Sequence, residues 1–229
     1  WASTRFPGKP LAEIHGKPML WHVYQRCVEA GCLDRIMVAT DDERIALACQ
    51  QYDIESMMTR RDHVTGTDRV AEVAQRIPAK FYVNVQGDEP LVSPEAIRLV
   101  TRASCDGPFW ATNGYAVIDD PADLMDTTVP KVVLRKDGTA LCLSRSPIPY
   151  PKARVSPHYF QVCVYRFHRE ALSWFASTTP GYVERMEGIE LLRFLEEGRP
   201  VKMVQVPPSL VAVDTIEDLE RARAAMAVA

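Results

Sequence analysis

The chain has 229 residues, of which 47% are apolar, enough to build the core of one large α/β domain. The formal net charge of -3 excludes the strongly basic composition typical of nucleic-acid binders, so we expect no nucleic-acid partner. No apolar stretch reaches the roughly 18 residues of a membrane span, and no signal-peptide pattern leads the chain. We therefore expect a cytoplasmic protein with no membrane partner.

The cysteine pattern agrees with a cytoplasmic location. The six cysteines include no CxxC pair, and most lie in apolar periodic runs. This pattern indicates reduced thiols in a core, with neither a disulfide framework nor a cysteine metal site.

The first residues form a loop, Ser3 to Leu11, that carries chemistry. Gly8 lets backbone approach a ligand closely, and Arg5 and Lys9 place two cations where phosphate oxygens can lie. The loop matches neither the ATPase P-loop nor the GxGxxG dinucleotide pattern, and on its own it favours a solvated basic turn over a phosphate site. Because phosphate-binding loops normally follow a buried strand, we expect that strand upstream of Trp1.

Helices and strands alternate through the next eighty residues. Apolar spacing predicts a helix from Pro18 that ends before Gly31, and a second helix over 43–51 that Asp41 caps. Further segments are predicted as strands at 35–40 and 55–58 and as a helix at 67–77. The β-branched and aromatic run 81–85 fits a buried parallel strand. This alternation predicts a doubly wound, mostly parallel α/β sheet whose ligands bind beyond the carboxyl ends of the strands.

The second half of the chain is richer in strands. They are predicted at 109–117, 131–135, 139–144, 159–167 and 201–206, with Asp137-Gly138 as a hairpin turn. The proline-rich run 146–152 is a loop of restricted shape. Helices are predicted at 169–176, at 183–197 and from Thr215, which forms a capping-box pattern with Asp218.

Two aspartates follow predicted strands. Asp88 comes after the run 81–85, and Asp214 ends the apolar run 210–213. Alone, each fits a turn or a helix cap. Together with Lys9 they favour a site in which Mg²⁺, held by carboxylate oxygens, bridges phosphates and neutralises the leaving pyrophosphate.

These motifs resemble those of the 3-deoxy-manno-octulosonate cytidylyltransferases, also named CMP-Kdo synthetases. The resemblance spans nearly the whole chain through the runs Ser3–Leu11, Gly16–Met19, Val38–Asp42, Met58–His63, Gly66–Arg69, Gln86–Pro90, Lys131–Val133, Ser144–Tyr150 and Val213–Thr215. It implies a single Rossmann-like nucleotidyltransferase domain over 1–229. A strand-rich segment at roughly 105–168 would serve the sugar acid and the contact of a homodimer.

The resemblance also implies an activity. The enzyme would couple CTP to the anomeric oxygen of a 3-deoxy-2-keto sugar acid, releasing pyrophosphate with Mg²⁺ as cofactor. The CMP-sugar product would feed lipopolysaccharide, a surface glycan.

Residue roles carry over from the same resemblance. Arg5 and Lys9 would hold the triphosphate, and Asp88 and Asp214 would bind Mg²⁺. The cytidine side would comprise Arg60, Gly66 and Thr67. The sugar-acid side would comprise Gln86, Arg145, Gln161, Tyr165 and Glu184. The planar guanidinium of Arg145 suits a carboxylate, and Glu184 can accept from sugar hydroxyls.

Departures from the family pattern lie on the acceptor side. Gln161 stands where a histidine is usual, and Leu191 stands where glutamine is common. Glutamine can donate to a carboxylate but cannot become cationic, so an amino or nine-carbon sugar acid stays open as the acceptor. A transferase acting on a sugar phosphate or phosphonate, and a non-catalytic nucleotide-binding homologue, are the alternatives.

Overall fold

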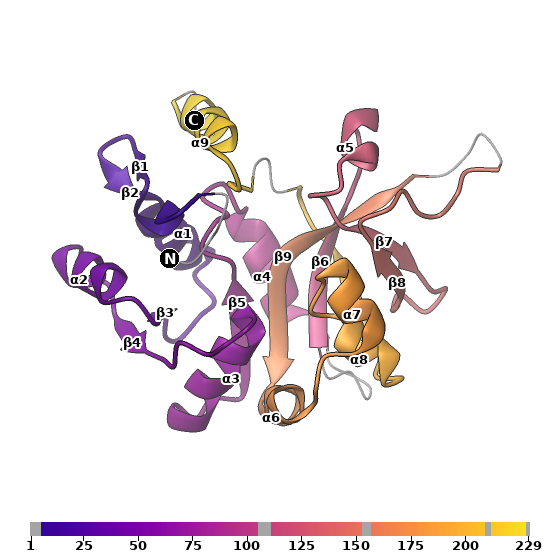
Figure 1. Cartoon of the computed structure of the whole chain (residues 1–229), viewed down its shortest axis with the longest axis horizontal. Coiled ribbons are helices and arrows are strands. Elements are labelled where there is room, and N and C mark those ends of the chain that lie inside the picture. The colour runs from indigo at the N-terminus through magenta and orange to yellow at the C-terminus, as the bar shows by residue number, and fades with distance from the viewer. Residues whose placement is uncertain (1–5, 105–110, 153–156, 209–211, 228–229) are drawn as a thin grey trace.

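The computed structural model describes residues 6–104, 111–152, 157–208 and 212–227 (Figure 1). The helices in these ranges are η1 (Lys9–Leu11, a 3-10 helix), α1 (Met19–Ala30), α2 (Glu43–Gln51), α3 (Gly66–Arg76), α4 (Pro94–Arg102), α5 (Pro121–Met125), α6 (Arg169–Ser177), α7 (Tyr182–Glu187), α8 (Leu192–Glu196) and α9 (Ile216–Met226). The strands are β1 (Glu13–Ile14), β2 (Lys17–Pro18), β3 (Val38–Thr40), β4 (Ser56–Met58), β5 (Phe81–Val85), β6 (Ala111–Val117), β7 (Lys131–Leu134), β8 (Ala140–Ser144), β9 (Tyr159–His168) and β10 (Val201–Gln205).

Strand β9 organises the main sheet. The strand order is β10-β6-β9-β7-β8, and β5 pairs with β9 as well. The pairing with β5 runs from Phe81 opposite His168 to Val85 opposite Val164, whereas β7 pairs with the other end of β9. Because β5 stops opposite Val164, the chain after Val85 leaves the sheet beside the middle of β9 (Figure 1). The positions of Gln86 and Asp88 are therefore determined by the point at which β5 stops pairing with β9.

The direction of pairing differs from the sequence prediction. The parallel pairs in the described residues are β3 with β4 and β10 with β6. Strand β5, predicted to have parallel neighbours, pairs antiparallel with β9, and β6 and β7 also pair antiparallel with β9. A strand covered on both faces shows the same apolar run whichever way its neighbour points, so the run predicted the strand but not the direction of its partner.

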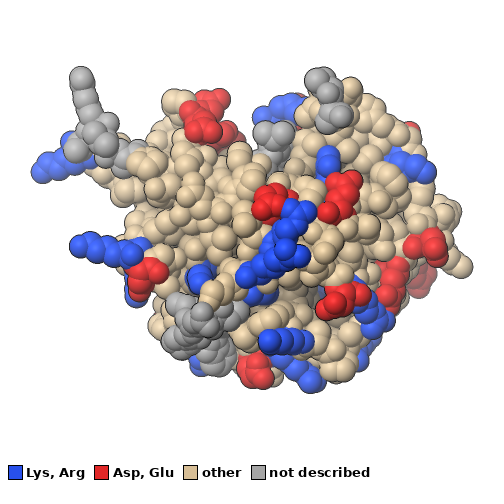
Figure 2. Space-filling view, turned by 180° about the vertical axis from the view of Figure 1, so that it is seen from behind, with Lys and Arg blue, Asp and Glu red and all other residues tan. Residues whose placement is uncertain are grey.

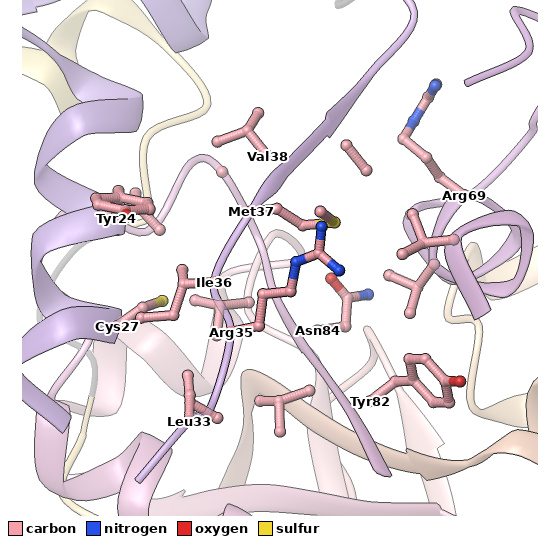
Figure 3. A pocket seen from close by; sticks show the side chains of 18 of the residues that line it. Tyr24, Cys27, Leu33, Arg35, Ile36, Met37, Val38, Arg69, Tyr82 and Asn84 are labelled. Atoms are coloured by element: carbon pink, nitrogen blue, oxygen red, sulfur yellow. The ribbon is translucent and has the colours of Figure 1, made fainter. Parts of the chain in front are cut away.

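Strands β3 and β4 form a separate two-stranded sheet beside β5 (Figure 1). A cavity of about 590 Å³ lies between this small sheet and β5. It is lined mainly by apolar side chains from α1, the segment before β3, α3 and β5. Figure 3 shows Ile36, Met37 and Val38 on one side of this cavity and Tyr82 and Asn84 on the other. The strand expected upstream of Trp1 stays a prediction.

Alternate residues of β9 point to opposite faces of the sheet. Val162 and Val164 pack against α4 in one buried cluster with Ile97. Tyr165 and Phe167 belong to the other cluster, which includes side chains from α3, α6 and α8. Cys163 packs against this second cluster, on the face that α3 covers, whereas Arg166 points to the other face and donates to the carbonyls of Thr101 and Ala103.

Helix ends follow their capping residues, with one correction. The final helix starts at a capping box of Thr215 and Asp218, as predicted. Helix α2 is capped by Asp42, whose carboxylate accepts from the backbone N–H of Arg44, and not by Asp41 as the sequence suggested. Adjacent aspartates have equal capping propensity, and only the backbone geometry selects between them.

The helix predicted over 183–197 is two helices. Gly188 ends α7 in the left-handed conformation, with φ 62° and ψ 37°, and α8 begins at Leu192. Glycine adopts this conformation at little cost, which makes it a helix terminator. The break lies two residues before Glu190, whose carboxylate contacts the start of α3.

No helix in the described part of the chain has the length and apolar character needed to cross a bilayer. On the face seen in Figure 2, lysine and arginine side chains lie interspersed with aspartate and glutamate. The described cysteines are free thiols, namely Cys27, Cys32, Cys49, Cys142 and Cys163.

Candidate active site

Lys9 joins the two aspartates that the sequence singled out. Its Nζ lies 2.6 Å from Asp88 Oδ2, 3.0 Å from Asp214 Oδ1 and 3.0 Å from the carbonyl oxygen of Val213. The backbone N–H of Val213 also donates to the carbonyl of Asp88 at 2.8 Å. Segments 79 and 205 residues away from Lys9 in sequence thus converge on its amine, and the predicted convergence is confirmed.

Local backbone geometry delivers Lys9 to that position. Gly8 precedes helix η1 with φ 76° and ψ 10°, a conformation that glycine adopts without strain. Pro10 sits in the first turn and fixes the backbone there. The loop is therefore shaped before any ligand arrives. Arg5, the second predicted cation, lies outside the described residues.

The electrostatics keep Lys9 charged. Burial lowers the pKa of its ammonium group, but the charges and hydrogen bonds of Asp88 and Asp214 outweigh burial and raise it. The Lys9 side chain is 13% exposed, whereas each carboxylate is 29% exposed. The site thus holds a shielded cation between two acids that remain open to solvent.

The donor set fits a divalent cation that also binds a ligand. No cluster of three His, Cys, Asp or Glu side chains arranged for a metal occurs in the described residues. Mg²⁺ needs no such cluster, because it is commonly held by one or two carboxylates with phosphate oxygens and water completing the shell. Two partly exposed carboxylates on one edge, already drawn together by a cation, meet that requirement.

The residues predicted for the cytidine side lie along one loop and helix start. The position of a Cβ on Gly66 would fall 3.3 Å from Gln86 Nε2, so glycine permits this close approach. The backbone N–H groups of Gly66 and Thr67 donate to Glu190 at 3.1 and 3.2 Å. Arg60 has a side chain that is 68% exposed and pairs with Asp62.

The acceptor side contains alternate residues of β9. Gln161 is buried, and its Nε2 has no hydrogen-bond partner within the described residues. Tyr165 and Cys163 are also enclosed, and burial raises the pKa of both groups, with acidic neighbours adding to the effect. Asp88 is among the charges that raise the pKa of Cys163, so Cys163 lies on the side of β9 that faces this carboxylate.

Arg145 is held by backbone oxygens. Its Nε donates to the carbonyl of Glu187 at 2.6 Å, and a terminal nitrogen donates to the carbonyl of Thr127 at 2.9 Å. Glu187 in turn accepts from the backbone N–H of Arg145 and from Ser144 Oγ. These contacts fix the guanidinium in place.

Glu184, predicted on the sugar-acid side, pairs with Arg193 in the structure, and its role there stays a prediction. Both of its carboxylate oxygens accept from Arg193, at 2.6 and 2.8 Å, in a buried ion pair. This pairing joins α7 to α8 and turns both carboxylate oxygens toward Arg193. A glutamate can accept from sugar hydroxyls, but the carboxylate of Glu184 points toward Arg193.

Glu190, which the sequence reasoning did not single out, lies beside Gly66 and Thr67. Its carboxylate accepts from the Gly66 and Thr67 backbone and from Thr67 Oγ1, and it contributes charge at Tyr165. Burial raises its pKa, although the hydrogen bonds from Thr67 and Gly66 oppose that rise. The signal for this residue is Gly188, which ends the helix two residues earlier.

Comparison with known proteins gives the family. The cytidylyltransferase family model matches residues 1–204. The 3-deoxy-manno-octulosonate cytidylyltransferase of Syntrophotalea carbinolica is 41% identical over 98% of this chain and 94% of its own length. The enzyme of the same name from Escherichia coli is 36% identical over 99% of this chain and 93% of its own length. The chain belongs to the 3-deoxy-manno-octulosonate cytidylyltransferase family.

A solved structure of CMP:2-keto-3-deoxy-manno-octonic acid synthetase complexed with CTP superimposes with a TM-score of 0.93. It is 36% identical, and the match covers 100% of this chain and 95% of that one. The inositol-1-phosphate CTP transferase from T. maritima, at 14% identity and a TM-score of 0.69, shares the fold alone. The α/β nucleotidyltransferase class predicted from sequence is thereby confirmed.

Proposed function

We infer that this chain is a CTP-dependent cytidylyltransferase that joins CMP to the anomeric oxygen of 3-deoxy-manno-octulosonate (Kdo) or a close analogue. Its family membership supports the reaction. The observation that carries the chemistry is the bridge from Lys9 to Asp88 and Asp214, which places a cation and two carboxylates together on one edge of the fold.

The nucleotide side of the mechanism rests on charge. Protonated Lys9, together with Arg5, would bind triphosphate oxygens, while Asp88 and Asp214 would hold Mg²⁺. Bound there, Mg²⁺ supplies Lewis acidity that lowers the pKa of the anomeric hydroxyl and offsets charge on the leaving pyrophosphate. The protein positions the hydroxyl and the α-phosphate for in-line displacement, which is the larger part of catalysis in phosphoryl chemistry.

The acceptor side rests on hydrogen bonds. The free Nε2 of Gln161 is a donor for a carboxylate or hydroxyl oxygen, and we propose that Tyr165 on the same strand and Gln86, just after β5, line the pocket with it. Arg145 would add a cation for the sugar carboxylate. We propose that Glu190 accepts from a sugar hydroxyl through Oε1, which accepts one hydrogen bond, from the Gly66 N–H, and keeps a lone pair. Glu184 is instead held against Arg193 in a buried ion pair.

The cytidine side rests on shape. Gly66 and Thr67 bring backbone close to Gln86, and Arg60 projects from the preceding loop. Backbone carbonyls there can read the exocyclic amine that distinguishes cytosine from uracil. We keep these residues as the cytidine subsite.

The setting of the enzyme is also a proposal. We propose a cytoplasmic homodimer whose product feeds lipopolysaccharide assembly. Strand β8 supports a contact through the strand-rich segment, because it ends the strand order of the main sheet and carries Leu141, an exposed apolar side chain. Light scattering of the purified protein distinguishes monomer from dimer.

A coupled pyrophosphate assay tests the function. CTP and Mg²⁺ are supplied with Kdo, its amino analogue, a nine-carbon ulosonic acid, or a sugar phosphate. We expect release with an ulosonic acid and none with the sugar phosphate. Release with the sugar phosphate alone would establish the other acceptor class, and tight CTP binding without turnover would establish a non-catalytic homologue.

A further inference from the structure

Helix α3 presents a polar stripe to the loop that precedes it. Arg69, Glu72 and Arg76 are spaced three and four residues apart, which places them on one side of the helix. All three contact residues of the loop Met58–His63. We name this stripe the α3 clamp.

Glu72 is the centre of the α3 clamp. It is a buried acid, 7% exposed, and its carboxylate accepts from the backbone N–H of Arg60 at 3.0 Å. The imidazole of His63, equally buried, and the guanidinium of Arg76 complete its partners. Burial raises the pKa of Glu72, but these donors outweigh burial and lower it. The acid is therefore charged and fully engaged.

The two arginines of the clamp fix the rest of the loop. Arg69 donates to Thr59 Oγ1 at 2.5 Å and to the carbonyl of Arg60 at 3.3 Å. Arg76 donates to the carbonyl of Met58 at 3.0 Å. Arg69 also approaches Asp41, which follows strand β3, and it lies at the rim of the cavity in Figure 3. The loop is thus tied at four of its residues.

Arg60 differs from its neighbours in what remains unrestrained. Its backbone N–H binds Glu72 and its carbonyl binds Arg69, so both peptide groups are held. Its side chain is 68% exposed and contacts the equally open Asp62. The chain then reaches Gly66, beside Gln86, only six residues later. A held backbone that carries an exposed cation beside the proposed cytidine side is the arrangement of a preorganised binding residue.

We propose that Glu72 is a positioning residue for CTP, acting through the backbone of Arg60. This inference rests on the proposed function, since it assigns Arg60 to the cytidine side. Losing the carboxylate frees the Arg60 N–H and the His63 ring together, so the loop samples other conformations and CTP must order it on binding. The penalty falls on nucleotide binding and spares the sugar acid.

The test is a kinetic double-mutant cycle with CTP and the sugar acid varied in turn. Glu72→Ala is expected to raise KM for CTP about tenfold while kcat and KM for the sugar acid change by less than about twofold. In an Arg60→Ala background, Glu72→Ala should add less than about twofold, because the two residues act as one unit. Glu95→Ala, an exposed acid paired with Arg98 on α4, is the matched control and should leave all three constants unchanged.

Glu72→Gln keeps the side-chain volume and an oxygen acceptor, so it serves if the alanine variant does not fold. It should raise KM for CTP about threefold, with the same selectivity. Equal rises in both KM values, or effects of Glu72 and Arg60 that multiply in the double variant, would overturn the proposal. Absence of pyrophosphate release by the unmodified chain would instead refute the proposed function.

Discussion

The buried ion pair between Glu184 and Arg193 allows a sharp test of how the acceptor side is assigned. The two side chains are 6% and 3% exposed, and Arg193 donates from two nitrogens to the two carboxylate oxygens. Arg193 also stacks over Phe175, 3.6 Å from the ring centroid, and donates to the Phe175 carbonyl. Removing the negative charge leaves a guanidinium that is buried without its principal partner.

The Glu184→Gln change should therefore be costly to the fold. Breaking a buried pair from one side destabilises proteins by about 3–5 kcal/mol, and the carbonyl partners of Arg193 favour the lower end here. For a domain of this size, about 3 kcal/mol corresponds to a fall in Tm of roughly 9 °C. Because the pair faces the junction of α7 and α8, KM for the sugar acid should change by less than about twofold in the folded variant.

The assay combines thermal unfolding by circular dichroism with pyrophosphate kinetics measured well below Tm. Glu197→Gln is the matched control, because this acid is exposed on the surface and should shift stability by less than about 0.5 kcal/mol. An unchanged Tm together with a large rise in KM for the sugar acid would refute the structural assignment. It would restore Glu184 to the acceptor pocket.

Three further outcomes follow from the site. Asp88→Asn and Asp214→Asn should each lower kcat by about 100-fold or more with little loss of Tm, measured by pyrophosphate release across a range of Mg²⁺ concentrations; activity close to that of the parent protein would contradict the metal assignment. The folded-state pKa of Glu190 is raised above 4.5, so its contribution to stability falls as pH rises through that pKa; Glu190→Gln should thus gain Tm relative to the parent at about pH 8 more than at about pH 5, and an equal gain at both would contradict the shift. Gln161→His should change the kcat/KM ratio between two sugar acids by about tenfold without abolishing turnover, and an unchanged ratio across the acceptor panel argues against contact at this position.

The central constellation was predictable from sequence because it obeys a topological rule. Asp88 follows a short apolar run, and such runs end at the edge of a sheet where ligands collect. Lys9 and Asp214 could be assigned to the same site from their local sequence. Lys9 follows the glycine of a loop, and Asp214 ends an apolar run just before a helix begins. The rule is stated for parallel strands, so it located Asp88 at the end of β5 but did not describe the antiparallel partner β9.

The acceptor side was harder because one glycine decides it. Helical spacing continues through Gly188, and a single glycine inside a helical pattern is usually tolerated at a cost of about 1 kcal/mol. Here it takes the left-handed conformation and ends the helix, which turns Glu190 toward Thr67 and leaves Glu184 against Arg193. The backbone conformation of Gly188 thus determines which partners Glu184 and Glu190 contact.

Helix α4 was missed for a different reason. Ser93 caps it and Pro94 occupies its first turn, which together are a recognised start signal. No element is predicted for this segment, because the prediction passes from Asp88 and Pro90 directly to the strands that follow. A cap is a local event, whereas the helix that it starts is stabilised by burying Ile97 and Val100 against the sheet.

The two sides of the site differ in how much of their hydrogen bonding is complete before ligands bind. The Gly66 and Thr67 N–H groups are already paired with Glu190, so the cytidine side is set in advance. Gln161 Nε2 is buried and has no partner within the described residues, and an unmade buried hydrogen bond costs about 1–3 kcal/mol. A sugar acid that places an oxygen against this nitrogen recovers that cost, which corresponds to roughly 10- to 100-fold in affinity over an analogue lacking the oxygen. Acceptor choice is therefore governed by the side of the pocket that is left incomplete, and nucleotide choice by the side that is already built.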